Sequence, residues 1–143
     1  MSRAVLDDHL LRDLLADNAS TGLTQILADH EAATTNLYLV RLCRSAVTAA
    51  GRALTGSWPA SARRELGRRL VALPDDIAVV PMRTIAFRIA ELADAHRLST
   101  LSAEAVAAAE HLDAPLCVWA GDDGPRLRAA VSSIGGEYRT ISN

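Results

Sequence analysis

The chain has 143 residues, and its 15 basic residues, all of them arginine, nearly balance 17 acidic residues, for a formal net charge of -2. This charge excludes a strongly basic nucleic-acid-binding protein, and the length fits one domain over residues 1–143 with a core of its own. Half of the residues are hydrophobic but only 3% are aromatic, so Ala, Leu and Val fill the interior, which favours helices packed closely on a small sheet over a β-sandwich.

The sequence also indicates where in the cell the protein is expected. No stretch approaches the ~20 apolar residues of a membrane span, and the first residues lack the basic-then-apolar pattern of a signal peptide. Cys43 and Cys117 have no CxxC or Cys/His ligand spacing, so we interpret both as free thiols in the core. We therefore expect a soluble, cytoplasmic protein without a membrane partner.

A short apolar run, Ala4 to Leu6, ends in two adjacent carboxylates, Asp7 and Asp8. Leucines at positions 10, 11, 14 and 15 follow at helical spacing, so the pattern predicts a buried strand that leads directly into a helix. Ligands of open parallel sheets bind beyond the carboxyl ends of the strands. Two interpretations of the aspartates remain open here: a helix N-cap, or part of a functional site.

The middle of the chain has mainly helical patterns. A short element is expected from Leu23 to Leu27, and a longer helix from Thr34 or Thr35 to near Gly51. Further helices are predicted over residues 61–71, 83–95 and 102–112. The apolar run over residues 77–80, which ends at a proline, predicts the second strand. This strand is expected to be parallel to the first, because the segment between them has helical patterns and is far too long for a hairpin.

The last third of the chain repeats the pattern of the first. A buried strand is predicted over residues 114–120, followed by a turn that carries Asp122 and Asp123, a helix over residues 127–134 and a final strand over 138–141. Strands that alternate with helices predict an α/β fold, with a small, mostly parallel sheet and helices on both faces. Right-handed crossovers would place both acidic turns at the same edge of that sheet.

Four arginines share most of one face of the helix predicted over residues 61–71; they are Arg63, Arg64, Arg68 and Arg69. The plainer interpretation is a solvated face paired with Glu65. The alternative is a surface that binds RNA phosphates.

The two ends of the chain resemble a known family. Residues 5–15, VLDDHLLRDLL, and residues 112–123, LDAPLCVWAGDD, resemble the opening strand and a later strand of the PIN domain. This nuclease fold is shared by the toxins of many bacterial toxin–antitoxin pairs, such as VapC. The resemblance covers most of the chain in the order of its elements, and it implies a single PIN-like domain with Mg²⁺- or Mn²⁺-dependent endoribonuclease activity.

The resemblance also assigns the acidic site. The first acid of the family falls on Asp7 and the last on Asp122 or Asp123, with Asp8 nearby. The family's acid on the helix after the first crossover falls on Arg41. An arginine there places a cation where the metal needs an anion, so we expect weakened or lost catalysis.

A further acid of the family, at the head of a later helix, falls on Ser102. Glu104 lies two residues beyond, about 200° around the helix, and replaces that acid only if the alignment shifts.

Three readings follow. The first is a metal-dependent ribonuclease, in which Asp7 and Asp122 bind metal and Thr34 or Ser102 orients phosphate or water. The second is a non-catalytic module that binds RNA, a protein partner or its own copy through the four arginines. A flavodoxin- or receiver-like module is the third, and it is disfavoured because the chain has no lysine and no Gly-rich loop after the first strand.

The partners follow from the same resemblance. PIN-like toxins commonly pair, so we expect a homodimer, and a cognate antitoxin would bind near the acidic edge. His9 follows the first acidic pair closely enough to reach the same crevice, but a first-turn histidine is more often exposed than a ligand. None of the four histidines has convincing ligand spacing, so we expect no zinc site.

Overall fold

A parallel sheet forms the middle of the computed structural model, which describes residues 2–48 and 54–142. The strands in this part of the chain are β1 (Ser2–Leu6), β2 (His30–Thr34), β3 (Ala78–Val79), β4 (Leu116–Trp119) and β5 (Tyr138–Ile141). Their order in the sheet is β3-β2-β1-β4-β5, and every neighbouring pair is parallel. The predicted α/β fold is therefore confirmed.

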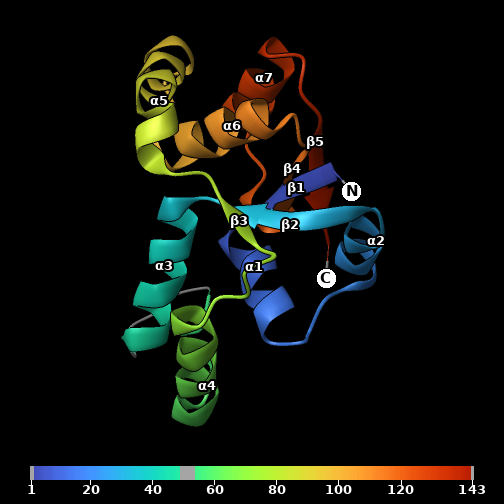
Figure 1. Cartoon of the computed structure of the whole chain (residues 1–143), viewed down its shortest axis with the longest axis vertical. Helices are drawn as coiled ribbons and strands as arrows, with labels where there is room; N and C mark the ends of the chain where they lie inside the picture. Colours follow the sequence, from blue (N-terminus) through green and yellow to red (C-terminus); the bar gives the residue numbers. More distant parts are fainter. Residues whose placement is uncertain (1, 49–53, 143) are drawn as a thin grey trace.

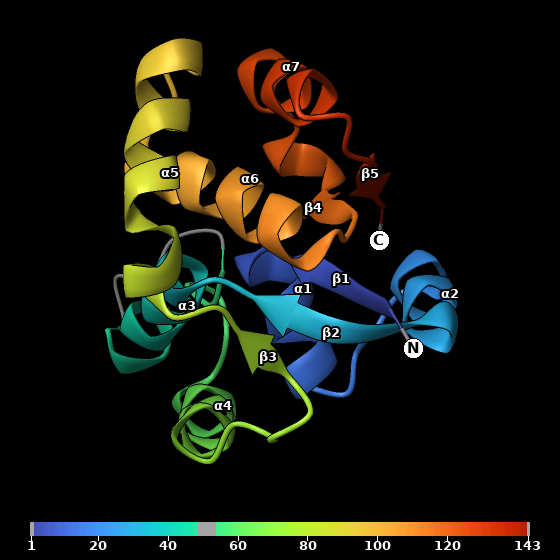
Figure 2. The same ribbon diagram turned by 45° about the horizontal axis from the view of Figure 1, so that its top comes forward.

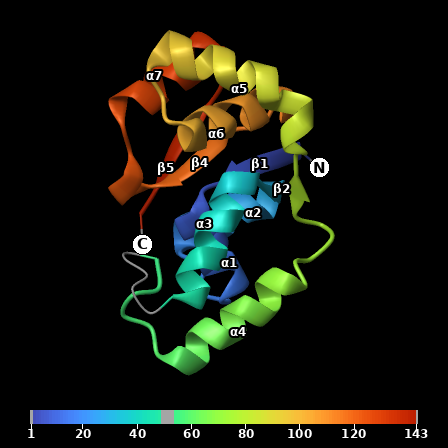
Figure 3. The same cartoon turned by 90° about the vertical axis from the view of Figure 1, so that its left-hand side faces the viewer.

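Helices cover both faces of this sheet, as predicted (Figure 1). They are α1 (Asp8–Leu15), α2 (Thr21–Asp29), α3 (Asn36–Val47), α4 (Ala60–Val71), α5 (Met82–His96), α6 (Thr100–Leu112) and α7 (Pro125–Ser133). Figures 2 and 3 show α5, α6 and α7 together on one face, and α1 and α4 on the other. None of the helices in the described ranges combines the length and the apolar composition that crossing a membrane requires.

Strand β2 was missed by the sequence analysis, which treated the segment between the first strand and residue 77 as helical. It begins with the polar residues His30 and Glu31 and continues with two alanines, and none of these residue types favours strands. The strand forms because its last three residues are buried beside β1. The predicted strand over residues 77–80 is the two-residue β3, which pairs with β2 at the edge of the sheet.

The remaining elements agree with the predictions within a few residues. Thr35 is the N-cap of α3, and its side chain accepts a hydrogen bond from the backbone of Tyr38. Helix α3 is described to Val47, so the predicted helix end near Gly51 lies outside the described residues. Helix α2 extends the short element expected at residues 23–27 to a helix of nine residues.

The strands separate two hydrophobic clusters. In β1, Val5 packs into the cluster formed with α5, α6 and α7, whereas Ala4 and Leu6 pack into the cluster formed with α1, α2 and α4. The buried side of α6 is nearly all alanine, from Ala103 to Ala109. Such small side chains let a helix lie close to a sheet. The packing leaves the carboxyl ends of β1 and β4 side by side, at the edge where the candidate site lies.

Candidate metal centre

Asp7 lies where β1 ends and α1 begins, and it serves as the N-cap of α1. One carboxylate oxygen, Oδ1, accepts a hydrogen bond from the backbone N–H of Leu10 at 2.9 Å. The other, Oδ2, accepts one from the backbone N–H of Trp119 at 2.9 Å. The same side chain therefore caps a helix and ties the end of β1 to the end of β4, so the two interpretations of Asp7 are compatible.

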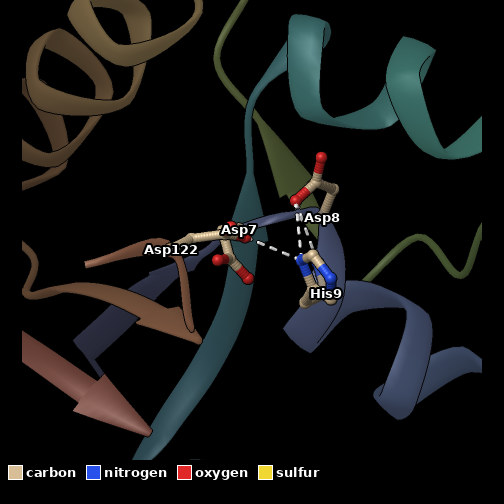
Figure 4. A group of neighbouring side chains, drawn as sticks. All are labelled: Asp7, Asp8, His9 and Asp122. Atoms are coloured by element: carbon tan, nitrogen blue, oxygen red, sulfur yellow. Dashed lines mark hydrogen bonds and ion pairs between the residues drawn. The ribbon is translucent and has the colours of Figure 1, made fainter. Parts of the chain in front are cut away.

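Four ionisable side chains meet at this edge of the sheet: Asp7, Asp8, His9 and Asp122 (Figure 4). One ligand atom from each lies within 4.8 Å of the ligand atoms of the other three. Asp8 and His9 belong to the first turn of α1, and Asp122 ends the 3-10 turn η1 (Ala120–Asp122) that follows β4. Asp122 is exposed, and the other three side chains are buried. This cluster could hold a metal ion.

His9 lies between two of the carboxylates. Its ring stacks on Trp119, with centroids 4.4 Å apart and planes 24° apart. Its Nδ1 lies 2.8 Å from Oδ2 of Asp122 and 3.5 Å from Oδ1 of Asp8. Figure 4 shows both ion pairs as dashed lines.

Oδ2 of Asp8 is a buried acceptor that makes no hydrogen bond with a described residue. Its ion-pair contact is Nη1 of Arg41 at 3.4 Å, and that arginine is half exposed. The ring nitrogens of His9 make no hydrogen bond with a described residue either, but Nδ1 lies in ion-pair contact with Asp122 and Asp8. Buried polar atoms in folded proteins nearly always have a hydrogen-bond partner, so the open acceptor of Asp8 supports a bound cation or water at this place.

Burial strongly affects the protonation of the cluster. Burial raises the pKa of Asp7 from 3.8 to about 7, against the opposing effect of the hydrogen bonds from Leu10 and Trp119. For His9, burial lowers the pKa, but the contact with Asp8 and the charges of the aspartates outweigh it, and the net shift is upward. Tyr38, in the first turn of α3, has its pKa raised well above 10 by burial and by the charges of the cluster.

Arg41 extends from α3 towards the cluster. Its Nη1 lies 3.4 Å from Oδ2 of Asp8, and its side chain is 52% exposed. The structure thus places a cation beside the acids. This guanidinium and a metal ion would compete for the same carboxylate oxygen.

The second acid of the later turn lies outside the cluster. Asp123 accepts hydrogen bonds from Oη of Tyr138 at 2.8 Å and from Arg128 at 3.0 Å. These two hydrogen bonds lower the pKa of Asp123. The structure therefore separates the two candidates for the last acid: Asp122 joins the cluster, and Asp123 pairs with α7 and β5.

Two hydroxyls proposed to orient phosphate or water occupy different places. Thr34 is fully buried at the end of β2 and donates a hydrogen bond to the carbonyl of Leu6 at 2.9 Å, so it joins two strand ends. Ser102 lies in the first turn of α6, where its backbone N–H donates to the Ser99 hydroxyl. Ser102 lines a surface pocket together with Asp122.

Glu104 is the acid that α6 buries completely. Its carboxylate accepts hydrogen bonds from the backbone N–H groups of Asn36 and Leu37 and from the Asn36 side chain, at 2.7–3.0 Å. Glu104 therefore caps the N-terminus of α3 from another helix, and it is not part of the four-residue cluster.

The four arginines of α4 contribute nothing to the cluster. Arg68 pairs with Glu65, and Arg69 pairs with Asp17 and Glu65 and donates to the carbonyl of Leu15. These contacts agree with the solvated-face interpretation. Arg63 and Arg64 form no ion pair with any described residue.

The sequence analysis did not predict that three further side chains lie beside the acids at this site: His9, Tyr38 and Trp119. For His9 the available signal was its position, directly after two carboxylates at a strand end. For the two aromatic residues, sequence carries no comparable signal, because their proximity to the acids depends on how α3 and β4 pack against β1.

Comparison with known proteins identifies no family for this chain. No protein-family model matches the chain. No curated protein matches it either.

Proposed function

We propose that this chain is a PIN-like domain with weak, Mg²⁺- or Mn²⁺-dependent endoribonuclease activity. The observation that carries the proposal is the four-residue cluster, in which three carboxylates converge and the buried Oδ2 of Asp8 makes no hydrogen bond with a described residue. Mg²⁺ and Mn²⁺ prefer oxygen ligands, so Asp7, Asp8 and Asp122 would hold the ion. The sequence resemblance to PIN nucleases supports RNA as the substrate.

In the proposed reaction, a bound metal ion and the side chains of the protein have different roles. A bound divalent ion supplies an activated water and stabilises negative charge on a phosphodiester. Asp7 must be ionised to act as a ligand, and its raised pKa means that it holds a proton below about pH 7. The ring of His9 stacks on Trp119, its Nδ1 lies 2.8 Å from Asp122, and the neighbouring carboxylates raise its pKa.

Arg41 weakens this site. A guanidinium 3.4 Å from Asp8 neutralises part of the charge that attracts a cation. The arginine side chain is half exposed, so solvent reduces the interaction to about 1 kcal/mol. The expected result is a centre that binds metal and hydrolyses RNA, but less well than a purely acidic site.

One observation favours a second candidate, a non-catalytic module that binds RNA or protein. Two of the three carboxylates already face a basic group: Asp8 faces Arg41, and Asp122 faces His9, which is a cation when protonated. Such pairs could neutralise the acids without metal. Metal binding therefore distinguishes the two candidates.

The first experiment is titration of the protein with Mn²⁺ by calorimetry near pH 7.5. We expect saturable binding, and we expect Asp8→Asn and Asp122→Asn each to raise the Kd at least about tenfold because each removes a charged ligand. The matched control is Asp123→Asn, one residue from Asp122 but paired with Tyr138 and Arg128, which should bind Mn²⁺ as the wild type does.

Two results would count against the nuclease proposal. One is no Mn²⁺ binding by the wild type at millimolar metal, and the other is equal binding by all three variants. Where binding follows the expected pattern, cleavage of single-stranded RNA with Mn²⁺ should be lost in Asp8→Asn and Asp122→Asn and retained in Asp123→Asn.

A second prediction concerns Arg41. Arg41→Gln should lower the Kd for Mn²⁺ about fivefold, because loss of about 1 kcal/mol of competing attraction corresponds to that factor. Arg44→Gln is the control, since Arg44 lies on the same helix, is exposed and forms no ion pair with a described residue. Equal affinities of the two variants would show that Arg41 does not compete with metal.

A further inference from the structure

A pocket of about 380 Å³ adjoins the candidate metal centre, and Asp122 belongs to both. It is built from the loop between α5 and α6, the first turn of α6 and the turn that leads into α7. Its polar lining, apart from Asp122, consists of Arg97, Arg126, Ser99 and Ser102.

The charge of this pocket is unbalanced. Neither Arg97 nor Arg126 forms an ion pair with a carboxylate among the described residues, whereas nearby Arg128 pairs with Asp123. Nη1 of Arg126 donates a hydrogen bond to the carbonyl of Arg97 at 3.3 Å, which links the two sides of the pocket. Two exposed arginines without an ion-pair partner among the described residues therefore line this surface pocket, together with one acidic residue, Asp122.

The hydroxyls complete a lining suited to phosphate. Oγ of Ser99 donates to Oγ of Ser102 at 3.3 Å, so both side chains lie at the same wall. Guanidinium groups and hydroxyls bind phosphate oxygens well, and arginine does so with two parallel hydrogen bonds. The N-terminal turns of α6 and α7, which also border the pocket, add to its positive potential.

A larger pocket, of about 700 Å³, lies at the other end of the sheet and does not share this character. Its arginines, Arg68 and Arg69, are paired with Glu65 and Asp17, and its lining includes further acids. Acidic residues neutralise the arginines of this larger pocket, so it has no excess positive charge that would attract an anion.

We propose that the pocket of Arg97, Arg126, Ser99 and Ser102 binds a backbone phosphate of single-stranded RNA, next to the phosphodiester that the acidic cluster acts on. This inference rests on the proposed function, since it names a substrate subsite of the same centre. The shared Asp122 makes the two sites contiguous. The subsite would hold the RNA chain in register with the acids.

The test is fluorescence anisotropy with a labelled single-stranded RNA of about eight nucleotides, at low salt and in EDTA. Arg97→Ala/Arg126→Ala should raise the Kd about tenfold or more. It should also reduce the slope of log K against log salt by about 0.7, because one phosphate contact is lost. The matched control, Arg63→Ala/Arg64→Ala, removes the same charge from α4 and should change the Kd by less than about twofold.

Equal weakening in both double variants would overturn the proposal, because overall charge would then explain the binding. Displacement of the RNA by inorganic phosphate at sub-millimolar concentration, with the same dependence on the two arginines, would also overturn it in favour of a small-anion site. Far-UV circular dichroism and a thermal melt check that the Arg97→Ala/Arg126→Ala variant folds.

Mn²⁺ calorimetry on the same variants separates this inference from the proposed function. Unchanged Mn²⁺ binding with weakened RNA binding in Arg97→Ala/Arg126→Ala supports both. If the wild type binds no Mn²⁺ but the arginine variant still loses RNA binding, the phosphate pocket stands and the metal-dependent activity fails. If RNA binding does not depend on the arginines while Mn²⁺ binds, only the pocket proposal fails.

Discussion

Glu104→Ala is expected to lower the free energy of unfolding by about 3–5 kcal/mol. The fully buried carboxylate accepts hydrogen bonds from two backbone N–H groups and one side-chain amide at the start of α3. Each buried donor left without an acceptor costs about 1–3 kcal/mol, and the truncated side chain leaves a cavity. The negative charge at a helix N-terminus is lost as well.

Chemical denaturation followed by circular dichroism measures this effect. Glu110→Ala is the control: Glu110 lies on the same helix but on its exposed side, in an ion pair with Arg88, and should cost less than about 1 kcal/mol. Glu104→Gln keeps one acceptor oxygen and should fall between the two. Equal stabilities of Glu104→Ala and Glu110→Ala would mean that the buried carboxylate does not support α3.

Loss of the cap also bears on the site. Helix α3 carries Tyr38 and Arg41, both of which interact with the acidic cluster. In a variant that still folds, displacement of the start of α3 should change Mn²⁺ affinity, although Glu104 is not one of the proposed ligands. The control Glu110→Ala should leave that affinity unchanged.

The metal-free protein is expected to lose stability as the pH rises from about 5 to about 8. Asp7 has a pKa of about 7 in the folded chain and 3.8 as its ordinary value. Between these values the folded state retains a proton that the unfolded state has released, so the stabilisation is complete below about pH 4 and is lost as the pH rises through about 7. The expected loss between pH 5 and pH 8 is about 3 kcal/mol.

His9 acts in the same direction. Its pKa is raised in the folded state, so its contribution is present below its ordinary value of 6.5 and is lost as the pH rises through the raised value. Both groups therefore oppose the usual trend, in which paired carboxylates make proteins more stable as the pH rises from acid to neutral.

Urea denaturation in EDTA at several pH values, with wild type and Asp7→Asn, tests this prediction. Asparagine keeps an oxygen for the N-cap hydrogen bond to Leu10 but cannot ionise, so the variant should lose about 3 kcal/mol less than the wild type over this range. Groups whose pKa does not depend on Asp7 cancel in the difference; the charge of Asp7 helps to raise the pKa of His9, so loss of that charge adds to the difference in the same direction. Parallel curves for the two proteins would contradict a raised pKa of Asp7.

Mn²⁺ should reverse the loss in the wild type. An ion that binds only the folded state stabilises it by about 2.7 kcal/mol at one hundred times its Kd. The stabilisation should grow with pH through about 7, as Asp7 becomes available as a ligand, and it should be much smaller in Asp7→Asn. No effect of Mn²⁺ on the unfolding of either protein would oppose the proposed metal centre.

Much of the fold follows from the local sequence. The apolar run before Asp7 and the run that ends at Trp119 are both short and uniformly apolar, which favours buried strands, and each is followed by a helical pattern. Once both are parallel strands, chain direction alone places Asp7 and Asp122 at the same edge of the sheet. Strand β2 could not be predicted in this way, because its alanines have no strand preference and its pairing with β1 supplies the missing stability.

The identity of the clustered groups depended on the tertiary structure. Asp122 and Asp123 are equivalent in sequence, but successive residues of a tight turn point in different directions, so Asp122 faces His9 while Asp123 faces Tyr138. His9 is buried, and Trp119 from β4 stacks on its ring. Sequence determined which strand ends carry carboxylates; long-range packing decided which side chains meet there, because the direction of each depends on neighbours far away in the chain.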